Sequence, residues 1–214
     1  MYRRNISNAS RGLNSTYAYF EDRVDDKQWT FNTILNTEIN DNIVLNASVN
    51  YQRLKSENFA EIIDLLGGTG YLNVNGFDGI QNDLRNPNRI VGEGDKFGYN
   101  FNLYANTING YANALFKYNK IDFYLSGSVT STDYQREGLY QNEANVRIDP
   151  TTEEVVFDNS YGKGEKLTFT GFGAKGGLTY KITGKHLLDV NAGYIQRAPS
   201  LRTTFTNSRI NQDV

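Results

Sequence analysis

Residues 168–194 read TFTGFGAKGGLTYKITGKHLLDVNAGY. Apolar and polar residues alternate on both sides of the TGKH segment, as in two strands joined by a tight turn. Gly171, Gly173 and Gly176 have the G-x-G-x-x-G spacing of a dinucleotide-binding loop, but the helix that such a loop requires does not follow. We therefore expect a β-hairpin in which the glycines lie inside a strand as small residues on one face.

Two more hairpins are expected upstream, on the same alternating pattern. In one, pairing Ile39 with Ile43 across a short turn places both apolar sets on the same face of the sheet. The other turns at Asn119 and Lys120, and a change of parity within its first strand indicates a bulge near Gly110. The chain thus predicts an all-β, antiparallel, up-and-down fold of about six or seven strands, at residues 30–39, 43–54, 98–118, 121–136, 167–182 and 187–197.

The connections between these strands alternate between short turns and two long polar loops, 56–97 and 137–166. Both long loops therefore emerge at the same end of the sheet. Long unstructured loops are unusual in a compact soluble domain, whereas outer-membrane barrels combine short periplasmic turns with long extracellular loops. Within the first loop, SENFAEIIDLLGG at 56–68 has apolar residues at helical spacing and predicts a short amphipathic helix.

Composition narrows the function classes. The formal net charge is −2, so no basic field attracts nucleic acid. The mean hydropathy is −0.58, and no segment is apolar enough for a membrane helix. The chain has no Cys and a single His, His186, so we expect no metal site and no cofactor. No paired carboxylates or nucleophile–base arrangement indicates catalysis, and we expect a protein that is not an enzyme.

Strand parity predicts which residues would face lipid in a barrel. We expect one apolar parity to be outward in every strand, with Asn, Ser and Thr on the opposite parity and aromatic residues near the strand ends. The residues expected to face lipid are Leu45, Val49, Phe123, Leu125, Val190 and Ala192.

Three segments carry a family resemblance: QNDLRNPNRIVGEGDKFGYNFN at 81–102, NSYGKGEKLTFTGFGAKGGLTYKITGKHLL at 159–188 and YIQRAPSLRTTF at 194–205. They resemble the barrel of TonB-dependent outer-membrane receptors, in the SusC/RagA-like branch whose members often carry a carboxypeptidase-regulatory-like domain. The resemblance implies a 22-stranded pore filled by a plug domain, which imports an extracellular glycan, peptide or metal chelate with energy delivered through TonB. It implies no catalytic residue.

Taken with this resemblance, residues 1–214 are expected to form one partial outer-membrane barrel domain. Measured against that family, we expect the 214 residues to cover barrel strands without the signal peptide, plug, TonB-contacting segment or final barrel strand. The expected partners are then outer-membrane lipid, the plug domain, the remaining barrel strands and TonB, with no nucleic acid; whether a surface lipoprotein lid takes part stays open. Gly171, Gly173 and Gly177 would leave room for the plug on the lumenal face.

Two alternatives remain at this point: a small complete outer-membrane barrel, and a soluble β-sandwich that binds a ligand. In the receptor interpretation, ligand or partner contact falls to polar residues at the loop end of the sheet. The candidates for contact are Asn82, Asp83, Arg85, Asn86, Arg89, Tyr134, Arg136 and Tyr140.

Overall fold

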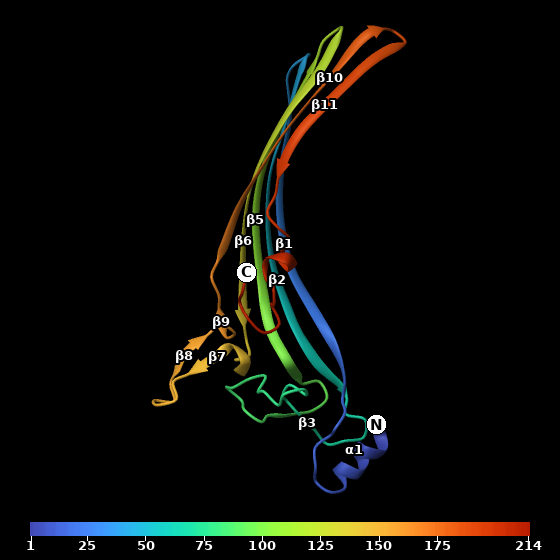
Figure 1. The fold of residues 1–214 in the computed structure, drawn as a ribbon. Coiled ribbons are helices and arrows are strands. Elements are labelled where there is room, and N and C mark those ends of the chain that lie inside the picture. Colours follow the sequence, from blue (N-terminus) through green and yellow to red (C-terminus); the bar gives the residue numbers. More distant parts are fainter.

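The computed structural model describes all 214 residues as one long, curved antiparallel sheet with loops gathered at one end (Figure 1). Six long strands pair in chain order, β1-β2-β5-β6-β10-β11, and the two-residue β9 pairs with β6. Their bounds are β1 Tyr19–Asn40, β2 Ile43–Asp64, β5 Lys96–Lys117, β6 Ile121–Gly138, β9 Gly162–Lys163, β10 Leu167–Thr183 and β11 His186–Gln196. The expected all-β, antiparallel, up-and-down order is confirmed; the sheet is open, because β1 and β11 each pair on one side only.

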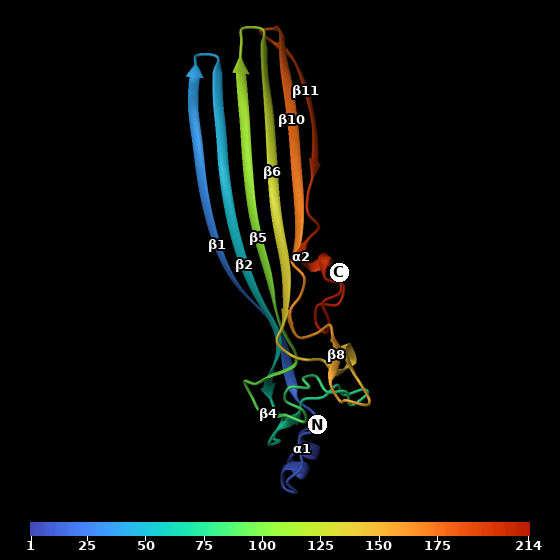
Figure 2. The same cartoon turned by 90° about the vertical axis from the view of Figure 1, so that its left-hand side faces the viewer.

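The two ends of the sheet differ in their connections, as the sequence predicts. The turns β1–β2, β5–β6 and β10–β11 are tight and lie together at one end, which we call the turn end (Figure 2). The other end, the loop end, carries α1 Tyr2–Ala9, β3 Tyr71–Leu72, β4 Ile90–Val91, η1 Glu143–Asn145, β7 Val146–Ile148 and β8 Val155–Asp158. After β11 the chain turns back over the sheet through α2 Leu201–Thr204.

Strands β1 and β2 are about twice as long as predicted, because the alternation continues through charged residues. The helix expected at 56–68 is wrong: residues up to Asp64 continue β2 and pair with β1 as far as Tyr19. The apolar residues that suggested a helix instead pack within the sheet and its loops, with Ile62 fully buried beside Val91. Cross-strand pairing therefore overrides the local helical spacing.

The predicted β1–β2 register holds along the strands but shifts by one residue next to the turn, and the predicted bulge in β5 lies elsewhere. Thr37 pairs with Leu45 as expected, but Asn40 rather than Ile39 faces Ile43. The turn at Asn119 and Lys120 is as predicted. No bulge occurs near Gly110; β5 pairs without interruption with β6, and its register shift to β2 lies instead where Gly98 adopts φ +69°.

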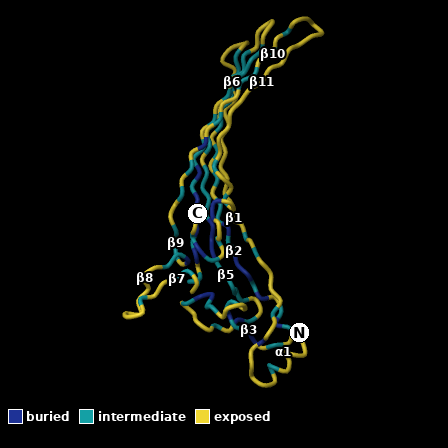
Figure 3. Tube along the Cα trace, in the orientation of Figure 1, coloured by how far each residue is buried: buried dark blue, intermediate teal, exposed yellow.

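Buried hydrophobic residues occur only toward the loop end. One small cluster joins Ile62, Leu65 and Val91, and another joins Phe101, Leu103, Tyr134 and Phe205. The half of the sheet near the turns has no buried hydrophobic residue, and Figure 3 shows it mostly exposed or half-buried. No helix in the structure is both long and apolar enough to cross a membrane.

Candidate functional site

The most distinctive surface of this chain is one face of the long sheet. We call face A the side on which Leu45, Ala114 and Leu125 lie in register, and face B the opposite side. Near the turn end face A is apolar, and these residues form the apolar zone: Leu35, Ile43, Leu45, Ala47, Val49, Ala112, Ala114, Phe123, Leu125, Val129, Phe172, Ala174, Leu178, Val190 and Ala192. The zone lies open, since Val49, Leu125 and Val190 are each at least half exposed.

Aromatic side chains mark the loop-end boundary of the apolar zone. Phe31 faces Tyr51 across β1 and β2, and Trp29 occupies the next position along face A. Across the sheet, the Phe172 ring lies 5.7 Å from that of Tyr194. The Trp29 side chain is 78% exposed. Large amphipathic rings at this level are typical of a surface that passes from an apolar to an aqueous environment.

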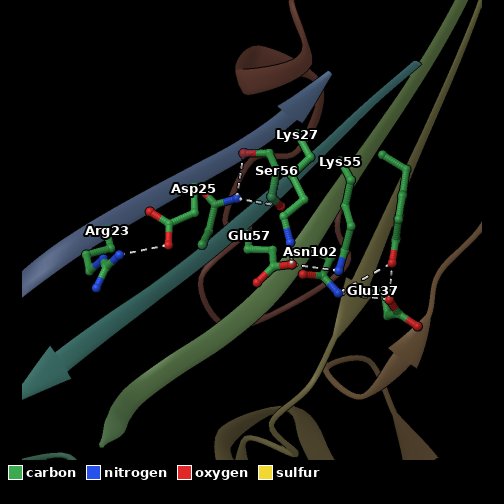
Figure 4. A network of polar contacts seen from close by, with 10 residues as sticks. Arg23, Asp25, Lys27, Lys55, Ser56, Glu57, Asn102 and Glu137 are labelled. Atoms are coloured by element: carbon green, nitrogen blue, oxygen red, sulfur yellow. Dashed lines mark hydrogen bonds and ion pairs between the residues drawn. The ribbon is translucent and has the colours of Figure 1, made fainter. Parts of the chain in front are cut away.

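Beyond the aromatic boundary, the same face A becomes charged (Figure 4). Arg23 contacts Asp25 at 3.0 Å and Glu61 at 2.9 Å, and Lys55 contacts Glu57 at 2.8 Å. We call the whole set the charged zone: Glu21, Arg23, Asp25, Lys27, Arg53, Lys55, Glu57, Glu61, Asn102, Tyr104, Asp133, Gln135, Glu137, Lys166 and Thr168. Exposed ion pairs of this kind contribute little stability individually, so the zone is mainly a solvated surface.

Neighbouring side chains of the charged zone form hydrogen bonds and ion pairs with one another across the strands. The Glu137 carboxylate accepts hydrogen bonds from Tyr104 Oη at 2.5 Å and from Asn102 Nδ2 at 3.0 Å. On β6 and β10, Lys166 pairs with Asp133 at 2.6 Å. The strands thus carry a continuous polar network, whereas the side chains a few residues away on the same face are mainly apolar.

The change from apolar to charged requires no irregularity in the backbone. Strand β2 pairs with β5 without a register shift from Ile43 to Phe59, so the same parity runs through both zones. The parity that is apolar at Val49 is simply occupied by Arg53, Lys55 and Glu57 further along. The polarity of face A is therefore determined by which residues occupy it and not by the backbone. The change occurs at about the same distance from the turns in neighbouring strands.

Face B shows the opposite order. Near the turn end it carries Asn, Ser, Thr and Lys side chains, including Asn113, Ser126 and Lys175. Toward the loop end it becomes apolar at Phe101 and Leu103, which the C-terminal segment 197–214 covers: Phe205 packs into this cluster. The two faces thus exchange character along the strands, and a β-sheet with a single apolar face does not do this.

Gly171, Gly173 and Gly177 of β10 lie on face B and Gly176 lies on face A, and neighbouring side chains occupy the space above the three on face B. The Tyr124 ring and the Asn191 amide lie over Gly177, and the Tyr124 hydroxyl donates to Asn191 Oδ1 at 3.1 Å. At Gly173, a Cβ atom would come 2.8 Å from Ser128 Oγ, and at Gly171, 2.8 Å from the Gln196 carbonyl oxygen. These glycines therefore allow close packing within the sheet. The sequence had suggested instead that they leave room for a plug.

Two of the predicted contact residues, Tyr134 and Arg136, lie in β6 on face B and are buried. The Arg136 guanidinium donates from Nε to the Ser208 carbonyl at 2.7 Å and from Nη1 to the Ser160 carbonyl at 2.9 Å. Tyr134 Oη donates to the Pro199 carbonyl at 3.0 Å. Burial without a carboxylate partner in contact lowers the pKa of Arg136 to about 10. Both side chains thus hold the C-terminal segment against the sheet.

The other predicted contact residues lie in the two long loops, which the structure brings together. Asp83 accepts hydrogen bonds from Asn86 Nδ2 at 2.7 Å and from the Gln141 amide at 3.1 Å, joining the loops. Buried Asn82 donates to Asn73 Oδ1 at 3.1 Å, and Arg89 pairs with Asp95 at 3.0 Å. These side chains have partners inside the loops.

The remaining predicted contact residues differ in how far they are exposed to solvent. The Tyr140 hydroxyl donates to the Lys96 carbonyl at 2.7 Å, and burial raises the pKa of this phenol. Arg85 is exposed, with its guanidinium 4.3 Å from the centre of the Tyr161 ring, and Asn86 is exposed beside it. Arg85 and Asn86 are therefore the two predicted contact residues that face solvent.

Sequence reasoning missed the charged zone of β1 and β2. The signal was present as strict alternation of charge at Glu21, Arg23, Asp25 and Lys27, all of which share face A. A run rich in charges reads as a loop when apolar alternation is the criterion for a strand. Comparison of the chain with family models, with curated proteins and with solved structures gave no match.

Proposed function

We propose that this chain is part of the barrel of a TonB-dependent outer-membrane receptor, which imports an extracellular glycan, peptide or metal chelate. The observation that supports this most is the exchange of polarity along face A. An apolar zone bounded by aromatic residues and followed by charge is the arrangement that a bilayer requires of the outside of a barrel.

The height of the apolar zone agrees with this proposal. On β2 it runs from Ile43 to Tyr51. About nine residues at about 3.3 Å each, tilted by about 40°, reach roughly 23 Å across a membrane, close to the roughly 25 Å apolar band of such barrels. The strands continue well beyond this zone, to 22 residues in β1, β2 and β5, so the sheet would project into the aqueous phase.

The proposal gives the two faces and ends separate roles. Face A would meet lipid at the apolar zone, and polar face B near the turns would meet the plug, through which TonB acts. The remaining barrel strands would pair with the free edges of β1 and β11, where backbone groups are left without a neighbour. The loop end would be extracellular and would carry exposed Arg85 and Asn86 toward ligand or a partner protein.

The soluble sandwich is less consistent with the same surface. A sandwich covers one face of each sheet with a second sheet along its whole length. In this chain the apolar zone is uncovered, and the only buried hydrophobic clusters lie at the loop end. A small complete barrel is the closer alternative, because it would present the same apolar zone.

Cell fractionation and uptake test the proposal in a Gram-negative host. The gene product is expected in the outer-membrane fraction, and its deletion is expected to abolish uptake of one of the three ligand classes; a proton uncoupler should have the same effect. Outer-membrane location with energy-independent uptake would favour the small barrel, and recovery as a soluble monomer would favour the sandwich.

A further inference from the structure

Positive side chains gather on face A directly beyond the aromatic boundary of the apolar zone. Arg53 lies opposite Trp29 across the β1–β2 pair, and Lys55 lies opposite Lys27 in the next row. The Lys27 side chain is 72% exposed, and Arg53 is exposed and makes no hydrogen bond or ion pair within the chain. The Arg53 guanidinium is therefore free to bind a group from outside.

The ion pairs of this cluster involve more cations than carboxylates. One carboxylate, Glu57, serves both lysines, at 2.8 Å from Lys55 Nζ and 3.7 Å from Lys27 Nζ. The next acid along β1, Asp25, is occupied by Arg23 at 3.0 Å. Among these three cations, Lys27 and Lys55 share one ion-pair partner and Arg53 has none, at the level where exposed Trp29 and Tyr51 end the apolar zone.

We propose that Arg53, Lys27 and Lys55 form a binding site for the phosphate of an anionic lipid headgroup. The site rests on the proposed placement of the apolar zone in a bilayer: Arg53 lies two residues beyond Tyr51, or about 7 Å along the strand, where headgroups follow the acyl chains. A guanidinium binds two phosphate oxygens at once, and flanking ammonium groups add to the attraction. Acyl chains would lie along Val49 and Leu35 beneath.

The continuity of the surface favours a lipid over a soluble anion. The cations are not enclosed in a pocket; they border an open apolar surface that begins at the adjacent aromatic row. A soluble phosphate would gain only the charges, in contact with water, whereas a lipid also covers apolar area. The partner is therefore a phospholipid or glycolipid that carries phosphate.

Trp29 provides a direct measurement, because it is the only tryptophan in the chain. The full chain is reconstituted in phosphatidylcholine vesicles that contain a fixed fraction of phosphatidylglycerol, with bromine on the acyl chains of one lipid or of the other. Bromine quenches tryptophan within a few bond lengths, so the two titrations give the relative affinity of each lipid for the site beside Trp29. We expect the anionic lipid to be preferred by more than ten-fold, because each of the three cations adds about five-fold.

The variants separate charge from fold. Arg53→Gln and Lys27→Gln should each lower the preference by about five-fold, the effect of one cation near a lipid surface, and Arg53→Lys should retain most of it. Lys120→Gln, which removes the same charge at the turn end, is the matched control and should change nothing. Circular dichroism confirms that each variant keeps its strand content.

The outcomes distinguish this site from the proposed function. Equal quenching by both lipids, with no change in Arg53→Gln, would overturn the phosphate site and leave the membrane placement standing. Absence of quenching by either brominated lipid would overturn both. Inorganic phosphate at constant ionic strength should leave quenching unaltered, and displacement of the anionic lipid by it would identify a site for a free anion instead.

Discussion

The ring of Tyr124 lies over Gly177, its direct partner across β6 and β10, and fills the space that a side chain at residue 177 would need. An aromatic residue that covers a glycine in the neighbouring strand protects the backbone and fixes the register of the pair. Face B gains this contact in the half of the sheet that has no buried hydrophobic residue.

Gly177→Ala should therefore destabilise the sheet. The added methyl group displaces Tyr124 and Asn191, and overpacking of this kind costs about 1 to 3 kcal/mol of unfolding free energy. Urea unfolding in lipid vesicles measures the loss. Gly110→Ala is the matched control: its added carbon meets nothing within 4 Å, and the alanine should be neutral or slightly stabilising. Equal losses in both variants would show that the Tyr124 contact is not the cause.

Arginine substitution distinguishes the two faces within the apolar zone. Val49→Arg and Leu125→Arg place a charge on face A within the apolar zone, and each should cost up to about 2 to 4 kcal/mol, the range for the middle of a bilayer. The neighbouring substitutions Asn50→Arg and Ser126→Arg fall on face B and should be much milder. Unfolding free energies in vesicles give the comparison, and equal penalties on both faces would contradict a lipid-facing apolar zone.

Cysteine labelling on intact cells tests the orientation of the sheet. The chain lacks native cysteine, so each introduced thiol is the only one in it. The variants are produced in cells as the whole natural protein. Thr152→Cys, in the exposed turn between β7 and β8, should react with a membrane-impermeant maleimide. Lys120→Cys and Lys185→Cys at the turn end should react only after lysis. Labelling in the reverse order would place the loop end in the periplasm.

Arg136 should control the order of the C-terminal segment. Arg136→Met keeps the apolar stem but leaves the Ser160 and Ser208 carbonyls without their donor, at a cost of about 2 to 3 kcal/mol. Hydrogen exchange should become faster in residues 197–213 and 158–164 while the turn-end strands keep their protection. Arg147→Gln, on the short β7 strand, serves as control. Unchanged exchange in Arg136→Met would mean that the apolar cluster and the other contacts, such as that of Tyr134 with Pro199, hold the segment without Arg136.

The sequence predicted the turn-end half of this fold well and the loop-end half poorly. Near the turns, alternation of apolar and polar residues is the only pattern that a two-faced sheet permits, and it located the tight turn at Asn119 correctly. Toward the loop end the outward parity is filled by residues such as Arg23 and Glu57, so hydropathy no longer separates strand from loop. The helical spacing of apolar residues at 56–68 led to a wrong prediction of a helix, because the local pattern of residues carries no information on cross-strand pairing.

The candidate contact residues show a second limit. In the sequence alone, a polar loop residue that contacts a ligand cannot be distinguished from one that contacts another part of the loop. Asp83 and Arg136 have their partners more than 20 residues away in sequence, at Gln141, Ser160 and Ser208. Such partners follow from how the loops close, which a single sequence does not reveal.

The level at which face A changes from apolar to charged fixes the thickness of bilayer that each hairpin would match. Because side chains alternate, a hairpin arm can be lengthened only in steps of two residues without exchanging its faces. One such step adds about 5 Å of apolar height at a tilt of about 40°. Mismatch with the surrounding bilayer costs a fraction of a kcal/mol per ångström, so a single step in these arms would already suit a different membrane.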